Sequence, residues 1–373
     1  MNWSLNAAQT NSTDLPQPSS SNPFLTEVFL SVLAESGSVT VDTGWEPTHA
    51  RHTDGLFMPV YRKDHSYGEY VFDWSWANAY AHSGLNYYPK LLTAIPYTPS
   101  QGPRILGDWR PEHLAEWTAQ LPDLCRDTGS SGWHILFPEP ELAQQFKSPD
   151  YILRQDCQFH WQNKGYRDFH DFLDNMTARR RKTVRKERQK VLAQGVELRM
   201  IEGVDMTSDW LRQFYLFYHT TYLKRGRTGY LTESFFTLLQ SRMAQQTVYA
   251  LAFRGEELIG GALFFKSDER LFGRYWGALY DVDCLHFEAC YYQGIEYAIA
   301  HGLRVFDPGT QGEHKIPRGF EPTPTFSAHW LAHREYHAAI AHHMRHERAQ
   351  VEAYIAEART LLPFKSDIYG EQP

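Results

Sequence analysis

Residues 271–320, LFGRYWGALYDVDCLHFEACYYQGIEYAIAHGLRVFDPGTQGEHKIPRGF, decide the fold class of this chain. The apolar run at 271–279 predicts a strand, and the apolar spacing over 287–301 predicts a helix that ends at Gly302. A second short strand at 304–307 leads into a polar loop that holds Gly-Glu-His-Lys and Arg-Gly-Phe. Strand, helix and strand predict an α/β sheet, in which ligands usually bind beyond the strand ends.

Length and composition exclude several classes of protein. The 373 residues suffice for two domains, and 42% apolar residues suit globular cores. A net charge of −7 argues against a surface that binds nucleic acid everywhere, although it leaves room for a local basic patch. Four cysteines without paired metal spacing, no apolar run of membrane-span length and no signal sequence predict a cytoplasmic protein.

The pattern of apolar segments and turns predicts two α/β halves joined by a basic helix. Within the second half, three successive strands joined by short polar turns predict an antiparallel meander. The predicted segments are a disordered N-terminus (1–22), a first domain (23–165), one basic connecting helix (166–195) and a second domain with a C-terminal helix (196–373).

The connecting helix carries the densest charge in the chain. Residues 177–190 contain eight Lys or Arg, and Arg181, Arg185 and Arg188 lie on one helical face. Eight like charges repel one another, so a polyanion nearby would relieve the repulsion. The pattern predicts either a polyanion-binding helix or a solvated linker helix with Glu187 as a local counterion.

Three residues near the predicted strand ends are candidates for acid/base catalysis. Glu288 falls in the first turn of its helix, where the helix dipole favours an ionised carboxylate. Such a group could accept the proton of an attacking ammonium, whose free pKa is about 10.4. His286 and His314 could play the same part closer to neutrality. The alternative for Glu288 is a plain charge at a helix N-terminus.

The loop at 309–320 combines glycines with charged groups. Its glycines allow the backbone to approach a ligand closely. Glu313 could serve in acid/base chemistry, and Lys315 and Arg318 could together clamp a carboxylate, a phosphate or a developing oxyanion. The alternative is a loop that these side chains merely pin in place.

Further candidates for substrate binding combine rings and polar groups. Such side chains suit a cleft wall that binds sugar, peptide or base, and they suit an interdomain interface equally well. A histidine stripe that starts at His329 lacks an HExxH motif, so no metal site is predicted. The substrate-binding candidates are Tyr67, Glu69, Lys90, His160, Trp161, Asn163 and, on the strand at 271–279, Tyr275.

Several long motifs identify the chain as similar to the FemAB-like branch of the GNAT acyltransferase superfamily. The resemblance covers roughly residues 22–366 and implies tandem GNAT-like domains with mixed, largely antiparallel sheets, hence an α/β (α+β) fold. The motifs are HSYGEYVFDWSWANAY from His65, YYPKLLTAIPYTPSQGPRIL from Tyr87, HILFPE from His134, QFHWQNKGY from Gln158, RRRKTVRKER from Arg179, HFEACYYQGIEYAI from His286 and GEHKIPRGF from Gly312.

The resemblance implies a transferase that moves an acyl or aminoacyl group onto an amine, with a small molecule or a peptidoglycan precursor as acceptor. The donor would be acyl-CoA or aminoacyl-tRNA, and no tightly bound cofactor is expected. Two alternatives remain open: a non-catalytic module that recognises a glycan or a peptidoglycan precursor, and an RNA-binding protein that uses the basic helix. The oligomeric state is left open by the sequence.

The chain departs from the usual acetyl-CoA-binding pattern at one junction. A standard GNAT domain carries a glycine-containing loop between the meander and the next helix, and its amides cradle a pyrophosphate. Here residues 280–288, YDVDCLHFE, contain no glycine and three acids, which would repel a pyrophosphate. Aminoacyl-tRNA as donor, coenzyme A in another pose, or no acyl transfer therefore all remain open.

Overall fold

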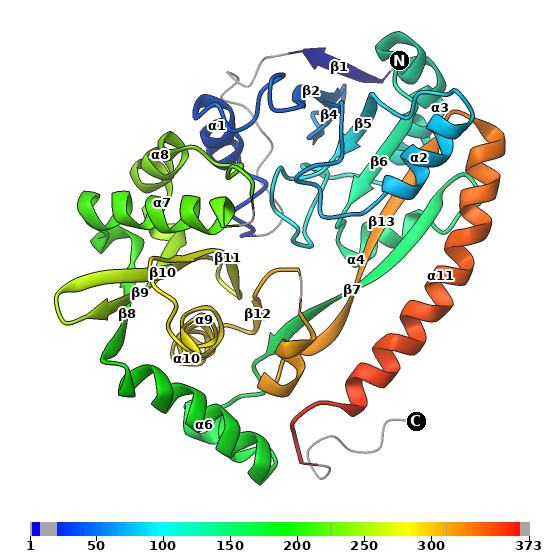
Figure 1. Ribbon diagram of the computed structural model, residues 1–373. Coiled ribbons are helices and arrows are strands. Elements are labelled where there is room, and N and C mark those ends of the chain that lie inside the picture. Colours follow the sequence, from blue (N-terminus) through cyan, green and yellow to red (C-terminus); the bar gives the residue numbers. More distant parts are fainter. Residues whose placement is uncertain (1, 8–20, 225, 311, 366–373) are drawn as a thin grey trace. The chain divides into compact units, whose positions relative to one another are not determined.

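The structure, a computed structural model, describes residues 2–7, 21–224, 226–310 and 312–365 (Figure 1). The chain divides into two compact units, and each is built from two separate segments of sequence. Unit 1 comprises Met1–Cys157 and Pro324–Ala353, and unit 2 comprises Gln158–Thr323 and Tyr354–Pro373. This division differs from the predicted one because strands β7 and β13 both run from one unit into the other.

Unit 1 is built on a mixed sheet with strand order β1-β2-β4-β5-β6-β13. Neighbouring strands are antiparallel except β5 and β6, which are parallel. The strands are β1 (Trp3–Ala7), β2 (Trp45–His52), β3 (Phe57–Met58, paired with β2), β4 (Tyr61–Lys63), β5 (Lys90–Thr93), β6 (Gly132–Leu136) and β13 (Glu321–Leu331). The helices are α1 (Glu27–Glu35), α2 (Trp74–His82), α3 (Pro111–Thr128), α4 (Pro140–Gln145) and α11 (Arg334–Thr360).

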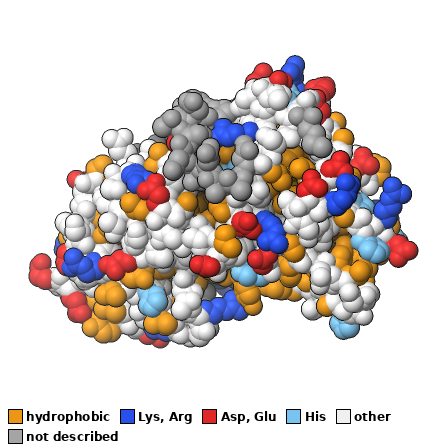
Figure 2. Space-filling model, turned by 90° about the horizontal axis from the view of Figure 1, so that it is seen from above, with side chains coloured by type: hydrophobic (Ala, Val, Ile, Leu, Met, Phe, Trp, Pro, Cys, Tyr) orange, Lys and Arg blue, Asp and Glu red, His pale blue; other side chains and the backbone are white. Residues whose placement is uncertain are grey.

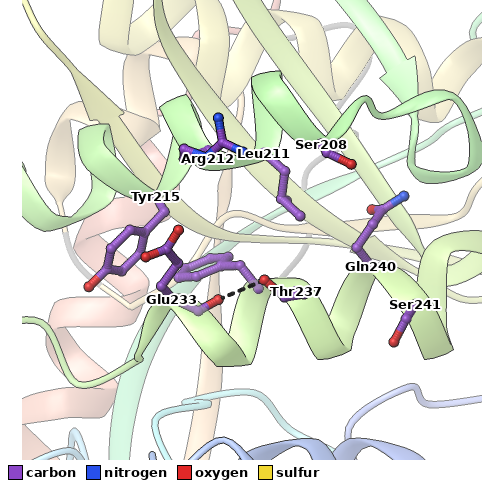
Figure 3. Close-up of a pocket in the computed structure, with 9 residues that line it drawn as sticks. Ser208, Leu211, Arg212, Tyr215, Glu233, Thr237, Gln240 and Ser241 are labelled. Carbon is purple, nitrogen blue, oxygen red and sulfur yellow. Dashed lines mark hydrogen bonds between the residues drawn. The ribbon is translucent and has the colours of Figure 1, made fainter.

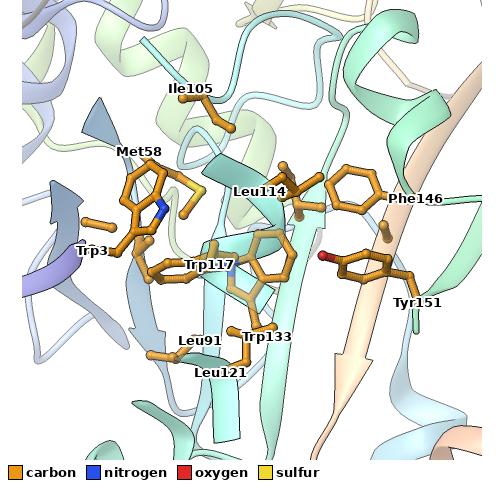
Figure 4. Packing of buried hydrophobic residues seen from close by; sticks show 14 of the residues in the cluster. Trp3, Met58, Leu91, Ile105, Leu114, Trp117, Leu121, Trp133, Phe146 and Tyr151 are labelled. Carbon is orange, nitrogen blue, oxygen red and sulfur yellow. The ribbon is translucent and has the colours of Figure 1, made fainter. Parts of the chain in front are cut away.

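An aromatic core holds α3 against the unit 1 sheet (Figure 4). Pro111 supplies the fixed φ that suits a first helical position, and Gly129, with a φ of 65°, ends the helix. Trp117 of α3 packs edge-on against Trp133 of β6, with ring centroids 5.7 Å apart. Large buried rings of this kind contribute most of the apolar area of a core.

The first residues of the chain belong to this core. Trp3 in β1 is buried, and its Nε1 donates a hydrogen bond to the carbonyl of His113 at 2.8 Å. The prediction of disorder over residues 1–22 is therefore wrong for residues 2–7, because a buried tryptophan and a strand pairing hold them. Residues 8–20 lie outside the described part of the chain.

Unit 2 repeats the same strand pattern in the order β8-β9-β10-β11-β12-β7. Its one parallel pair, β11 and β12, occupies the position that β5 and β6 occupy in unit 1. The predicted meander is confirmed as β9, β10 and β11, and so is the predicted fold class of tandem α/β units with mixed, largely antiparallel sheets. The strands are β7 (Ile152–Gln162), β8 (Val196–Glu202), β9 (Thr247–Arg254), β10 (Glu257–Lys266), β11 (Arg270–Ala278) and β12 (Val305–Asp307).

Helices cover both faces of the unit 2 meander (Figure 1). On one face α7 approaches β11 so closely that a Cβ on Gly277 would lie 2.1 Å from the carbonyl oxygen of Phe217. Glycine is therefore required there. The helices are α5 (Phe169–Asp174), α6 (Ala178–Ala193), α7 (Ser208–Leu223), α8 (Glu233–Met243), α9 (Leu285–Phe287) and α10 (Gln293–Ala300), with a π turn at Glu288–Tyr292 and 3₁₀ turns at Gly203–Asp205, Ala244–Gln246 and Glu313–Arg318.

The predicted single connecting helix over 166–195 is wrong, because it is broken between α5 and α6. Met176 forms an isolated bridge with Phe364, and the amide of Thr177 donates to the carbonyl of Pro363 at 2.8 Å. These contacts extend the backbone at 175–177 and separate a short helix from the basic one.

The described helices include none that combines the length and the apolarity needed to cross a bilayer. On the face shown in Figure 2, Lys and Arg side chains lie among Asp and Glu side chains rather than in one block.

Candidate active site

A buried cluster of charged residues lies where β12 ends in unit 2. Asp307 accepts two hydrogen bonds from the guanidinium of Arg274, at 2.7 and 3.3 Å, and one from the amide of Gly309 at 2.9 Å. Nε2 of His160 lies 3.7 Å from the same carboxylate and donates to Gln158 at 3.1 Å. Burial alone would raise the pKa of Asp307, but the charge of Arg274, together with the hydrogen bonds from Arg274 and Gly309, outweighs it and holds the pKa well below its usual range.

Lys315 completes this cluster, named here the Asp307 centre: His160, Arg274, Asp307 and Lys315. Its Nζ donates to the carbonyl of Gly309 at 2.6 Å, and its side chain is buried. Burial is the main cause that lowers the pKa of Lys315 to about 8, and burial likewise lowers the pKa of His160 to about 4. The centre therefore combines an ionised acid and a fixed cation with a neutral imidazole and an amine that titrates near neutrality.

A π turn at Glu288–Tyr292 interrupts the helix that the sequence predicted as continuous over 287–301. Such turns insert one extra residue into a helix and occur often at functional sites. The turn places Tyr291 and Tyr292 on the side that meets the 309–320 loop. The hydroxyl of Tyr291 lies 2.8 Å from Nε2 of His314, and the hydroxyl of Tyr292 accepts from Nε of Arg318 at 3.0 Å.

The structure brings the two predicted catalytic histidines together around Tyr291. The ring centroids of His286 and His314 lie 6.3 Å apart, and that of His286 lies 5.3 Å from Tyr291. His314 is exposed at the surface, whereas Tyr291 is buried. Partial burial, followed by the charges of Lys315 and Arg318, lowers the pKa of His314 below its usual value. His314 is therefore a neutral, solvent-accessible base at pH 7.

Glu288, the other predicted base, is held by protein donors. The guanidinium of Arg188 donates to both of its oxygens, at 2.9 and 3.1 Å, and the amide of Gln293 donates at 2.8 Å. Glu288 is buried, and Arg188 also binds Glu296. The carboxylate of Glu288, bound to Arg188 of α6, thus anchors α6 to the π turn.

Lys315 and Arg318 do not form the predicted clamp around one anion. Lys315 reaches the carbonyl of Gly309, whereas the guanidinium of Arg318 binds Glu187 at 2.6 Å and lies 3.5 Å above the ring of Phe287. Each cation is satisfied by a different protein group, so the two side chains diverge. The third charged residue of this loop, Glu313, lies at the surface and accepts from the hydroxyl of Tyr354 at 2.9 Å.

The remaining predicted unit 2 residues separate into different roles. His160 joins the Asp307 centre, but the next residue, Trp161, is fully buried beside Tyr166, with ring centroids 5.9 Å apart. Asn163 caps a turn, since its Oδ1 accepts from the amide of Gly165 at 3.0 Å. Tyr275 packs against α7, with its ring 5.5 Å from Tyr218. Alternation along a strand sends neighbouring residues to opposite faces, which separates His160 from Trp161.

The unit 1 candidates likewise separate into buried and exposed groups. Lys90 and Glu69 are buried and bonded to each other, with Nζ and Oε2 2.8 Å apart. Tyr67 remains 47% exposed. Of these three predicted substrate-binding residues, Tyr67 alone presents its side chain to solvent.

The basic helix α6 presents different cations to solvent from those predicted. Arg188 points inward to Glu288, and Arg181 pairs with Asp174 at 3.1 Å. Arg185 is exposed, as predicted for a polyanion-binding residue. Within the described part of the chain, four exposed cations of α6 have no ion pair, and they define the α6 cationic stripe: Arg179, Lys182, Arg185 and Lys186.

Among the described residues, one group has the composition of a metal site: His52, Asp54 and His113 in unit 1. The lone pair of each imidazole is already used, because Nδ1 of His52 accepts from the amide of Asp54 and Nδ1 of His113 accepts from the amide of Arg110, both at 3.0 Å. A metal ligand needs that lone pair. The group therefore does not fit a metal ion.

A cavity of about 370 Å³ lies between α7 and α8 (Figure 3). Its walls include Arg212, Tyr215, Glu233 and Gln240. It contains none of the predicted catalytic residues, and most of its polar lining is exposed. It is therefore separate from the Asp307 centre.

The two repeated units define a tandem GNAT-like α/β protein. The family model described as peptidoglycan biosynthesis/recognition, FemAB-like, matches residues 4–366. The chain therefore belongs to the FemAB-like family. No curated protein sequence matches it.

Solved structures show the same fold at low sequence identity. L-PGS from Bacillus licheniformis is 11% identical, with 88% of this chain and 98% of that chain covered at a TM-score of 0.53. FemX is 11% identical, with 87% and 96% covered at 0.52. The C-terminal domain of a putative lysylphosphatidylglycerol synthetase from Agrobacterium fabrum is 9% identical, with 84% and 93% covered at 0.52.

Sequence reasoning missed Arg274, Asp307 and Tyr291. Two signals could have found the first pair: a lone arginine inside an apolar strand, and an aspartate at the end of the next parallel strand. A buried charge must be paired, so each implied the other. No sequence signal marks the π turn that positions Tyr291.

Proposed function

We propose that this chain is an N-acyltransferase that moves an acyl or aminoacyl group from an activated donor onto an amine of a peptidoglycan-related acceptor. The observation that carries the proposal is His314, a neutral and exposed imidazole bonded to Tyr291 beside two buried cations. The family description and the fold shared with FemX support a substrate from peptidoglycan metabolism.

The chemistry requires a base and a stabilised oxyanion. His314 takes a proton from the amine as its nitrogen attacks the acyl carbonyl, directly or through the hydroxyl of Tyr291. The C–N bond forms, the C–S or C–O bond to the donor breaks, and the proton passes to the departing thiolate or alkoxide. The charges of Lys315 and Arg318 that disfavour a proton on His314 favour negative charge at the same place.

Glu288 and His286 are the other candidates for the base, and the structure favours them less. The oxygens of Glu288 are occupied by Arg188 and Gln293, so it acts as a positioning group for the π turn. His286 packs edge-on between Trp276 and Tyr291, with centroids 5.5 and 5.3 Å away. His286 therefore acts as a positioning group, which holds Tyr291 against His314.

Replacement of His314 by asparagine should lower kcat about 100-fold with little change in KM, since general-base catalysis contributes that much. The measurement is acyl transfer from acetyl-CoA, and separately from aminoacyl-tRNA, onto a lysine-containing stem peptide. Because the pKa of His314 is lowered, native activity should persist to a lower pH than a free imidazole would allow before protonation of the ring abolishes it.

Two further variants separate the alternatives. His343→Asn, at an exposed position of α11, should leave turnover unchanged. Glu288→Gln should reduce turnover less than His314→Asn; a complete loss with intact acceptor affinity would make Glu288 the base instead. Binding of the acceptor without turnover from either donor would leave only a recognition module.

The choice of donor turns on the α6 cationic stripe. Asp283, one of the two acids that precede α9, pairs with Lys190 at 2.7 Å, and the junction contains no glycine cradle. Acyl-CoA in its usual pose would meet this acid. Four exposed cations with no ion pair in the described structure suit an RNA backbone, so aminoacyl-tRNA is the donor proposed.

Changing Arg179, Lys182, Arg185 and Lys186 to glutamine should weaken tRNA binding and flatten its salt dependence. Loss of up to four phosphate contacts should reduce the slope of log K against log salt by roughly 3. Gel-shift titrations with bulk tRNA at several salt concentrations measure this slope. Arg304→Gln, which removes an exposed arginine of unit 2, is the matched control. No shift by tRNA at low salt would exclude this donor.

A further inference from the structure

The unit 1 loop between β4 and α2, residues 64–73, sends three side chains inward to one ammonium group. Ser66 Oγ, Glu69 Oε2 and Asp73 Oδ2 lie 2.8, 2.8 and 2.5 Å from Nζ of Lys90. The four side chains are buried. These three contacts with the ammonium of Lys90 hold the loop against the sheet.

Two tyrosines that precede β5 strengthen this anchor. The hydroxyl of Tyr87 donates to Asp73 at 2.6 Å, and the hydroxyl of Tyr88 lies 2.8 Å from Ser66 Oγ. Networks of buried ions contribute little net stability compared with apolar packing, and their best-attested role is to specify one geometry. This network therefore specifies the backbone conformation of the loop at residues 64–73.

The loop backbone adopts conformations that such anchoring must impose. Tyr70 has a φ of 61°, which a bulky residue rarely adopts. Gly68 has a φ of 81°, and a Cβ there would lie 2.6 Å from the ring of Tyr97. Backbone conformations of this kind are found where ligands are held in a preformed shape.

The same loop, continued into the first residue of α2, sends three aromatic side chains outward. Tyr67, Phe72 and Trp74 are 47%, 55% and 38% exposed, although large rings are usually buried. The rings of Tyr67 and Trp74 lie 5.1 Å apart at an angle of 57°. These three residues are named the aromatic platform.

We propose that the aromatic platform binds the sugar rings of an N-acetylhexosamine glycan. The inference rests on the proposed function, because it names the sugar part of a peptidoglycan-related acceptor. A pyranose presents an apolar face of C–H groups with hydroxyls at its edge. The platform offers ring faces together with the indole N–H of Trp74, which match such a ligand.

The size of the platform favours a sugar over a protein partner. The rings of Tyr67 and Trp74, which lie 5.1 Å apart, present on the order of 200 Å² of exposed surface. A stable protein interface buries about 1,200 Å² or more in total. One or two sugar residues fit the smaller area, and a rigid loop binds them without loss of conformational freedom.

The test is binding of chitotetraose and of a soluble N-acetylglucosaminyl-N-acetylmuramyl peptide to the full chain, followed by calorimetry and tryptophan fluorescence. Trp74→Ala and Tyr67→Ala should each weaken binding roughly tenfold, as expected for loss of a stacked ring. Tyr280→Ala removes an equally exposed tyrosine from unit 2 and should have no effect. Sedimentation with purified sacculi distinguishes the polymer from the soluble precursor as the source of the sugar.

The outcomes separate this inference from the proposed function. Unchanged binding by both platform variants, or no binding of either soluble sugar at millimolar concentration, would overturn the inference while His314-dependent transfer stands. Sugar binding without any transfer would overturn the proposed function alone. A change of oligomeric state in Trp74→Ala, with sugar affinity unaltered, would assign the platform to a protein contact and also overturn the inference.

Discussion

Replacement of Arg274 by methionine should lower the free energy of unfolding by roughly 3–5 kcal/mol, because it leaves a buried carboxylate without its cation. The side chains of Arg274 and Asp307 are only 2% and 1% exposed, and two hydrogen bonds join them. Removing one partner costs far more than the pair contributes, since the remaining charge stays out of water. Urea unfolding followed by circular dichroism measures the loss.

Two control variants test whether the loss of stability comes from the buried, unpaired carboxylate. Arg304→Met breaks an exposed pair with Glu269, whose side chains are 71% and 60% exposed, and should cost less than about 1 kcal/mol. The double variant Arg274→Met/Asp307→Leu should recover part of the loss, because no buried charge is left unpaired. A cost below about 1 kcal/mol for the single variant would show that water reaches Asp307.

Replacement of Lys90 by methionine should also lower the free energy of unfolding by roughly 3–5 kcal/mol at pH 8, because it leaves buried carboxylates of unit 1 without their cation. Burial alone would lower the pKa of Lys90, but Asp73 and Glu69 outweigh it and raise the pKa above its usual range. The variant would leave Lys63, whose pKa burial lowers to about 7, as the ammonium that still acts on both carboxylates. Lys63 is thus only partly charged near neutrality and compensates poorly.

The loss of stability caused by Lys90→Met should become smaller as the pH falls. In the native protein, burial already raises the pKa of Glu69 to about 7. Without Lys90 the folded-state pKa of Glu69 rises further above its unfolded value, and the pKa of Asp73, which Lys90 holds below its usual range, rises because of burial, so folding takes up protons. Stability is then present at low pH and lost as pH rises, and the deficit should shrink between pH about 7 and 5. Lys190→Met, at an exposed site, should show no such trend.

The sequence predicted the architecture well wherever local pattern and tertiary context agree. The meander, α3 and α11 follow from apolar periodicity and from glycine and proline punctuation. The break in the basic helix at 175–177 did not follow, because it depends on pairing with residues near 363, almost 190 positions away in the chain. The ordered strand at residues 3–7 depends in the same way on its partner β2.

The candidate site was predicted in its location more than in its contacts. The sequence predicted His286, His314 and Lys315 as one site, and in the structure the ring centroids of His286 and His314 lie 6.3 Å apart. It could not show that Lys315 donates to a backbone carbonyl, because that contact depends on how the loop folds back on itself. Nor could it show that Arg188 turns inward to Glu288, since the two residues are 100 positions apart in the chain. Ion pairing over such separations is set by the fold, and it decides which charges stay free for a ligand.

The origin of β13 has a consequence for biosynthesis. The strand that completes the unit 1 sheet beside β6 is encoded after nearly all of unit 2. A nascent or truncated chain that stops before Pro324 would leave the backbone of β6 unpaired at an open edge, which invites aggregation. The first unit is therefore unsuited to expression alone, and any dissection of the protein must carry residues 324–353 with it, for instance as a circular permutant.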